Sequence, residues 1–108
     1  MTVVFSSTKA IGALIIAILV SRGHLHYEDK AGLISFDGEL SIEQARDHQY
    51  VSRLIENTKP KWPAGTETGY HAITFGWLLD QLVRRADPAK RSLAQFYREE
   101  IQQCITKC

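Results

Sequence analysis

A serine and a lysine three residues apart near the start of the chain can form a nucleophile–base pair. Ser6 and Lys9 belong to the stretch Ser6-Ser7-Thr8-Lys9, which directly precedes a strongly apolar segment. Residues three apart on a helix share one face, with about 5–6 Å between their Cβ atoms, and burial disfavours the charged form of a lysine. Such an amine can accept the hydroxyl proton and prepare the serine for attack on a carbonyl. The spacing also fits a helix-capping Ser6 and a solvated Lys9.

A tyrosine that follows a loop rich in glycine and proline is a second candidate for proton transfer. Tyr70 lies in Gly69-Tyr70-His71-Ala72, just before a helical pattern. A phenol at the mouth of a helix can relay a proton when a nearby cation favours its ionised form. An ordinary half-buried aromatic residue fits the same position when it is considered alone.

The helix that would position Ser6 and Lys9 is apolar on nearly all sides. It is expected to begin at Ser6 or Ser7 and to stop near Gly23, a residue typical of helix ends. Its apolar run, Ala10 to Val20, is about half of the roughly 20 residues that cross a bilayer, so no transmembrane segment is predicted. An all-round apolar helix must be buried on most sides. No signal-peptide cleavage site follows the run, and the sequence leaves the localisation unknown.

Three further helices are predicted, and serines cap two of them. Ser41 and Ser92 each have a glutamine three residues later, which is the capping-box pattern. The expected spans are Ser41 to about Glu56, His71 or Ala72 to the Asp87-Pro88 break, and Ser92 to the C-terminal residues. The side chains expected to face inward or to form an apolar face are Tyr50, Val51, Leu54, Ile55, Phe75, Leu78, Leu79, Leu82 and Val83. In the last helix, helical spacing is followed by Leu93, Phe96, Tyr97, Ile101, Cys104 and Ile105. Thr2-Val3-Val4-Phe5 is expected to be extended.

The composition indicates one small globular domain. The chain has 108 residues, 44% of them hydrophobic, and a net charge of +1, which argues against a general nucleic-acid binder. The charge-rich run Asp87 to Arg98 is mixed in sign and is interpreted as solvated surface. His24 with His26, and Cys104 with Cys108, each lack a third ligand nearby, so no metal site is predicted.

Two blocks of the sequence together resemble the serine β-lactamase-related family, which includes class C-like β-lactamases, relatives of penicillin-binding proteins and esterases. Val4-Phe5-Ser6-Ser7-Thr8-Lys9-Ala10 is similar to the family's Ser-x-x-Lys segment. The stretch Lys59 to Arg85 is similar to its second motif region. The matching residues there are Trp62, Gly65-Thr66, Gly69-Tyr70-His71-Ala72, Thr74-Phe75-Gly76-Trp77-Leu78 and Leu82-Val83-Arg84-Arg85. The helix from Ser92 to Ile101 also resembles the family, so that about four-fifths of the chain is covered.

The resemblance implies roles for three residues. Ser6 would be the acyl-accepting nucleophile, Lys9 its general base and Tyr70 the proton shuttle, with no metal or organic cofactor. Ala72 stands where the family's Tyr-x-Asn motif has an amide that helps to hold a β-lactam side chain. This departure favours an esterase-like activity on a small ester, amide or peptide-like substrate.

The resemblance also implies that the chain is a partial domain. The family fold is α+β, of the serine β-lactamase and DD-peptidase kind, and its third motif, Lys-Thr-Gly, has no equivalent here. We therefore expect residues 1–108 to form a truncated, mostly α-helical portion with about four helices and little sheet. The opening strands, a segment at the Lys30–Ala31 junction and the C-terminal sheet are expected to be missing.

Two functional interpretations remain open on the sequence. One is a serine hydrolase whose acyl-enzyme forms at Ser6, with activity impaired by the missing motif. The other is a non-catalytic remnant of the family that at most binds a partner. In either case the apolar helix Ala10 to Val20 would lack the sheet that covers it in the family, and self-association through its uncovered faces is expected. A small helical membrane-associating protein is a third interpretation, but the chain lacks the basic amphipathic face this requires.

Overall fold

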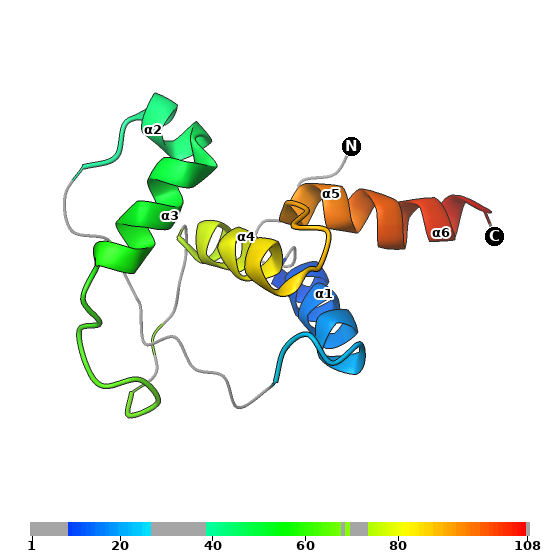
Figure 1. The fold of residues 1–108 in the computed structure, drawn as a ribbon, viewed down its shortest axis with the longest axis horizontal. Coiled ribbons are helices and arrows are strands. Elements are labelled where there is room, and N and C mark those ends of the chain that lie inside the picture. Colours follow the sequence, from blue (N-terminus) through cyan, green and yellow to red (C-terminus); the bar gives the residue numbers. More distant parts are fainter. Residues whose placement is uncertain (1–8, 27–38, 68, 70–73, 108) are drawn as a thin grey trace. The chain divides into compact units, whose positions relative to one another are not determined.

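The computed structural model describes residues 9–26, 39–67, 69 and 74–107 (Figure 1). Two compact units are distinguished, residues 1–28 with 79–108, and residues 29–78. The regular elements of the described residues are helices, and none of these residues lies in a strand. The predicted mostly helical character is confirmed for this part of the chain. The extended segment predicted at Thr2-Val3-Val4-Phe5 lies outside the described residues.

Helix α1 spans Lys9–Ser21 and ends as the sequence predicts. Gly23 adopts a positive φ of 76°, a backbone conformation that glycine enters without the steric cost of a Cβ atom. The amide of His24 donates to the Leu19 carbonyl at 2.9 Å, and the amide of Gly23 donates to the Val20 carbonyl at 3.0 Å. This pair of bonds is a Schellman motif, which satisfies carbonyls at the end of the helix.

One face of α1 forms part of the core of the first unit. Ile15 and Leu19 are buried and cluster with Val83, Phe96 and Ile101, and α1 packs against α5 (Leu93–Tyr97). Two other apolar side chains of the helix are open among the described residues. Leu14, about a quarter turn around the helix from Ile15, is 49% exposed, and Ile11, one turn before Ile15 on the same face, is 39% exposed. The prediction that α1 is buried on most sides is therefore wrong for these two side chains. Leu14 is exposed because the helix packs along one stripe, and Ile11 is exposed because the residues of α1 in the core cluster begin one turn later, at Ile15.

The second predicted helix is two helices with a break between them. Ser41 caps α2 (Ile42–Arg46), and its hydroxyl oxygen accepts from the Gln44 amide at 3.2 Å while Gln44 accepts from the Ser41 amide at 3.0 Å. The predicted capping box is thereby confirmed. The chain then leaves the helical conformation at Asp47, whose carboxylate accepts from the amides of Gln49 and Tyr50 and caps α3 (His48–Asn57). A single helix from Ser41 to Glu56 is therefore wrong, because Asp47 bonds to the backbone in a way that starts a new helix.

Helix α4 spans Phe75–Ala86 and ends at the predicted Asp87-Pro88 break. Its expected start at His71 or Ala72 lies outside the described residues. Leu79 and Val83 are buried as predicted, whereas the other predicted inward side chains of this helix, Phe75, Leu78 and Leu82, are half-buried.

The fourth predicted helix is one helical run with a π turn at its centre. It consists of α5 (Leu93–Tyr97), the π turn η2 (Arg98–Gln102) and α6 (Gln103–Lys107), and the Ser92 hydroxyl oxygen accepts from the Gln95 amide at its start. Phe96 and Ile101 are buried. Cys104 and Ile105 follow the same helical spacing but are exposed. The wider π turn shifts the register of the residues that follow it, and α6 continues as an exposed helix end (Figure 1).

Within the described residues, each helix falls short of the length and apolar character needed to cross a membrane.

Two leucines of α1 provide a test of the one-sided packing. Leu19 is fully buried and Leu14 is 49% exposed, although both are leucines of the same helix. We expect Leu19→Ala to lower the free energy of unfolding by about 2–5 kcal/mol through lost burial and a residual cavity. Leu14→Ala is expected to change it by less than about 1 kcal/mol. Urea unfolding followed by circular dichroism measures both, and equal losses would contradict this packing.

Candidate active site

Lys9 is the one predicted catalytic residue that the structure describes. It is the first residue of helix α1 and is half-buried. Ser6 and Tyr70 lie outside the described residues, so the predicted convergence of the three groups stays a prediction. Lys9 is the first described residue of the chain, so the expected start of this helix at Ser6 or Ser7 lies outside the described residues.

The loop before Tyr70 contains a tight turn. The Thr66 amide and hydroxyl both donate to the Pro63 carbonyl, at 3.2 and 2.7 Å. Gly65, at the third position of the turn, has a φ of 85°, and a positive φ at this position is the reason that such turns favour glycine. The Gly65-Thr66 pair of the second motif region is therefore held by local hydrogen bonds.

A buried aspartate organises the connection between α4 and α5. Asp87 is 2% exposed, and its carboxylate accepts from Arg91 through the Nε atom at 2.8 Å, the Nη2 atom at 3.1 Å and the backbone amide at 3.0 Å. Two parallel bonds between a guanidinium and a carboxylate form a strong and geometrically specific pair. This pair closes the loop Asp87–Arg91, in which Lys90 adopts a positive φ of 56°.

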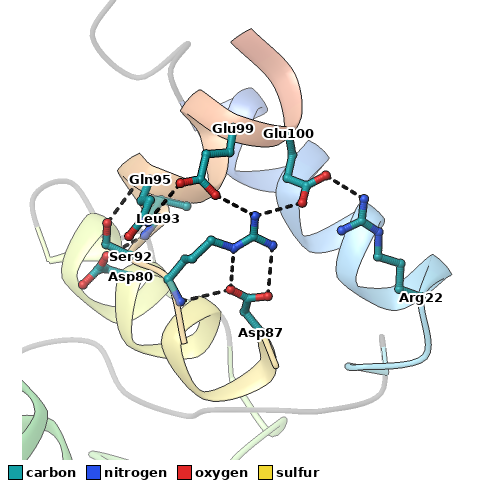
Figure 2. A network of polar contacts seen from close by, with 9 residues as sticks. Arg22, Asp80, Asp87, Ser92, Leu93, Gln95, Glu99 and Glu100 are labelled. Atoms are coloured by element: carbon teal, nitrogen blue, oxygen red, sulfur yellow. Dashed lines mark hydrogen bonds and ion pairs between the residues drawn. The ribbon is translucent and has the colours of Figure 1, made fainter. Parts of the chain in front are cut away.

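The Arg91 guanidinium continues the network into the π turn. Its Nη1 atom donates to Glu99 at 3.0 Å and to Glu100 at 2.9 Å. The other oxygen of Glu100 accepts from the Nη2 atom of Arg22 at 2.8 Å. Figure 2 shows Glu100 between these contacts, with Arg22 reaching it from the end of α1. One carboxylate of the π turn thereby binds Arg91, nine residues before it, and Arg22, 78 residues before it.

The same network lies on the apolar core. The Arg91 guanidinium carbon lies 4.7 Å from the centre of the Phe96 ring, and that of Arg22 lies 5.9 Å from it. A cation over an aromatic face is attracted by the negative face of the ring. Phe96 is fully buried, so both the ionic network and the apolar core contact this one side chain.

A second aspartate ties α4 to the start of α5. The Asp80 carboxylate accepts from the Leu93 amide at 2.8 Å and from the Nε atom of Arg84 at 2.8 Å. The Leu93 amide is one of the donors at the beginning of a helix that have no partner within the helix. Asp80 therefore adds a cap from a neighbouring helix to the cap that Ser92 provides (Figure 2).

These contacts displace the pKa values of the charged groups involved. The hydrogen bonds from Arg91 lower the pKa of Asp87 to about 2. Those from Arg22 and then Arg91 lower the pKa of Glu100 to about 2. The bond with Asp87 raises the pKa of Arg91, and the bond with Glu100 raises that of Arg22.

The interpretation of Asp87 to Arg98 as solvated surface is wrong for the first part of this run, from Asp87 to Arg91. The side chains of Asp87 and Arg91 are only 3% and 15% exposed. Opposite charges four residues apart are a known pairing signal, but Pro88 lies between them and suggested a simple helix break. Nothing local in the sequence indicates that Arg22, 78 residues from Glu100, belongs to the same network.

Among residues 9–26, 39–67 and 74–107, no group of three or more His, Cys, Asp or Glu side chains is placed to hold a metal ion.

The ionic network predicts a loss of stability in acid. Asp87 and Glu100 have pKa values of about 2 in the folded chain and about 4 when unfolded. A lowered pKa stabilises the fold above the unfolded value, and this contribution disappears as the pH falls from about 4 to 2. We expect the urea midpoint to fall steeply over this interval.

The substitution Asp87→Asn separates the contribution of the buried Asp87 carboxylate to this acid dependence from that of Glu100. We expect it to destabilise the fold by about 2–4 kcal/mol at pH 7, because the buried Arg91 loses its main counter-ion, and to flatten the acid dependence. Glu67→Gln, at an exposed position, serves as the control and should leave both unchanged. An acid profile of Asp87→Asn that matches the wild type would show that Asp87 does not titrate in this way.

Comparison with known proteins identifies the family of the chain. The family model described as Beta-lactamase matches residues 1–103, which includes the Ser6-Ser7-Thr8-Lys9 and Gly69-Tyr70-His71-Ala72 stretches. Comparisons with curated proteins and with solved structures found no significant match. Because the family model covers nearly the whole sequence, the chain belongs to the β-lactamase family.

Proposed function

We propose that this chain functions as a serine hydrolase that forms an acyl-enzyme at Ser6. Membership of the β-lactamase family carries this proposal, and the family indicates serine-hydrolase-like function. The position of Lys9 at the first residue of α1 supports it further. Ser6 precedes this helix by three residues, a spacing that places the two side chains on one face if the helix extends back to it.

The proposed reaction has two half-reactions. The Ser6 hydroxyl oxygen attacks the substrate carbonyl carbon while its proton passes to the Lys9 amine. The bond to the leaving group then breaks, and the leaving alcohol or amine receives a proton relayed through Tyr70. Water then attacks the acyl-serine ester, which releases the carboxylic acid and returns the proton to Ser6.

Helix α1 contributes an electrostatic element to this proposal. The N-terminal end of a helix carries a partial positive charge from its unpaired amides. Lys9 lies at this end of α1, which is 13 residues long. If the helix extends back to Ser6, this end of the helix stabilises the negative charge that develops on the serine oxygen.

The substrate class follows from Ala72. In the family, an amide at this position of the second motif helps to hold a β-lactam side chain, and alanine offers no such hydrogen bond. We therefore propose small esters, amides or peptide-like compounds, rather than β-lactam antibiotics, as the substrates. Esters are favoured because their leaving groups require less assistance than amines.

A covalent probe tests the nucleophile. We expect a fluorophosphonate to label the folded protein at Ser6, and Ser6→Ala to abolish this labelling. The matched control is Ser7→Ala, which removes the adjacent hydroxyl and should retain labelling. Intact-mass spectrometry with peptide mapping measures both. No labelling of a chain shown by circular dichroism to be folded would contradict the proposal, as would equal labelling of Ser6→Ala.

Replacement of Lys9 tests the base. We expect Lys9→Met to lower the rate of labelling by about 10²-fold or more, the usual contribution of a general base, and to leave the helical circular dichroism unchanged. The control is Lys61→Met, which removes an exposed lysine from the loop after α3. Wild-type rates in Lys9→Met would assign the deprotonation of Ser6 to another group.

The alternative is a non-catalytic family member that associates through uncovered apolar surface. The exposure of Ile11 and Leu14 on α1 favours this alternative, because adjacent exposed aliphatic side chains mark interaction surfaces when they are part of a larger patch. Absence of labelling in a folded chain whose mass by analytical ultracentrifugation rises with concentration would favour it over the hydrolase.

A further inference from the structure

The C-terminal helical run changes its register at the π turn. From Leu93 to Ile105, the apolar residues follow the spacing of one continuous α-helix. The structure departs from that helix at η2, where the Gln103 amide donates to the carbonyl of Arg98, five residues earlier. Each residue of an α-helix turns by about 100°, so one extra residue in a turn rotates everything after it by about this angle. The run therefore has two registers available, the α register that its spacing favours and the π register that it adopts.

Arg91 is a fixed cation beside this turn. Its side chain is 15% exposed, and its Nε and Nη2 atoms donate to Asp87 at 2.8 and 3.1 Å. Its guanidinium carbon lies 4.7 Å from the centre of the buried Phe96 ring. Because a guanidinium is planar and its donors point in fixed directions, these contacts also fix the direction of the remaining Nη1 atom.

Two adjacent glutamates of the π turn share that Nη1 atom. It donates to Glu99 at 3.0 Å and to Glu100 at 2.9 Å, and Figure 2 shows the two carboxylates turned toward the same guanidinium. On an α-helix, neighbouring residues do not face each other. A π turn holds more residues per turn, so the angle between neighbouring side chains is smaller. The double contact therefore fits the π register better than the α register.

We propose that Arg91 sets the register of the C-terminal helix through an ionic lock, the contact of its Nη1 atom with Glu99 and Glu100. With the lock closed, residues 98–102 form the π turn. Without it, residues 93–107 become one α-helix in which α6 is rotated by about 100°. The rotation brings Cys104 and Ile105 into line with the apolar stripe of the preceding turns. The ionic lock is thus a conformational device that decides which face α6 presents.

The other polar partners of the two glutamates are less suited to this role. Gln95 donates to Glu99 at 2.9 Å, a pairing four residues apart that an α-helix also allows. Arg22 binds the other oxygen of Glu100, but its side chain is 45% exposed. Arg91 is the partner that Glu99 and Glu100 have in common and the more buried of the two arginines.

Apolar packing is the rival cause of the π turn. Phe96 and Ile101 are buried in the same core cluster, and their separation of five residues equals the spacing of the π hydrogen bond. Substitution of the glutamates and substitution of Ile101 distinguish the two causes.

Scalar couplings across hydrogen bonds identify the register in the full chain by nuclear magnetic resonance. The Gln103 amide nitrogen couples to the carbonyl carbon of Arg98 in the π register and to that of residue 99 in the α register. We expect the Arg98 coupling in the wild type. In Glu99→Ala/Glu100→Ala we expect its loss and a coupling to position 99 instead. The matched control, Arg98→Ala/Gln102→Ala, places two alanines at exposed positions of the same turn and should keep the Arg98 coupling.

Ile101→Ala tests the rival cause. We expect this variant to keep the Arg98 coupling, because Arg91 and both glutamates remain. Its loss would assign the register to core packing and overturn the proposal. The proposal would also be overturned by an undiminished Arg98 coupling in the glutamate variant, by a wild type coupled to position 99, or by loss of the Arg98 coupling in the alanine control.

Glu99→Gln/Glu100→Gln keeps the size of both side chains and decides the question if the alanine variant does not fold. Charge-assisted hydrogen bonds are about twice as strong as neutral ones, so we expect the Arg98 coupling to fall by about half or more as the π register loses population. An Arg98 coupling equal to that of the wild type would show that the charges of the lock do not hold the π turn.

Discussion

The described part of the first unit depends on the ion pairs that the Arg91 guanidinium makes with neighbouring carboxylates. The guanidinium lies 15% exposed above the ring of the fully buried Phe96, where an unpaired charge would be costly. Asp87 binds it in a two-pronged pair, and Glu99 and Glu100 accept from its remaining donors. Three carboxylates and one aromatic ring thus surround most of this cation.

The ion pairs around Arg91 and the apolar core of the first unit meet at Phe96. Phe96 belongs to the core with Ile15, Leu19 and Val83, and its ring also supports two arginines. Two kinds of contact therefore fix the loop between α4 and α5: the burial of Phe96 in the apolar core and the ion pairs of Arg91. Asp80 strengthens the junction because it caps α5 from α4.

The ends of the elements were the part of the fold most accessible to sequence reasoning. The Ser41 and Ser92 caps and the Gly23 stop were identified correctly, since capping depends on hydrogen bonds between near neighbours in the chain. The interruption at Asp47 was missed because an aspartate inside a periodic apolar pattern can be solvated or can start a new helix. The π turn was missed because its sequence keeps an α-helical spacing.

The sequence motifs determined the family of the chain. For the candidate site, spacing and family resemblance together propose Ser6, Lys9 and Tyr70, because a nucleophile and its base can lie close together in the sequence. The tertiary structure decided that Asp87 and Arg91 are buried, that Glu100 joins the end of α1 to the π turn, and that Ile11 and Leu14 face outward. These features arise from contacts between segments far apart in the chain. Local periodicity and spacing carry no information about which distant side chain will neutralise a charge or cover an apolar face.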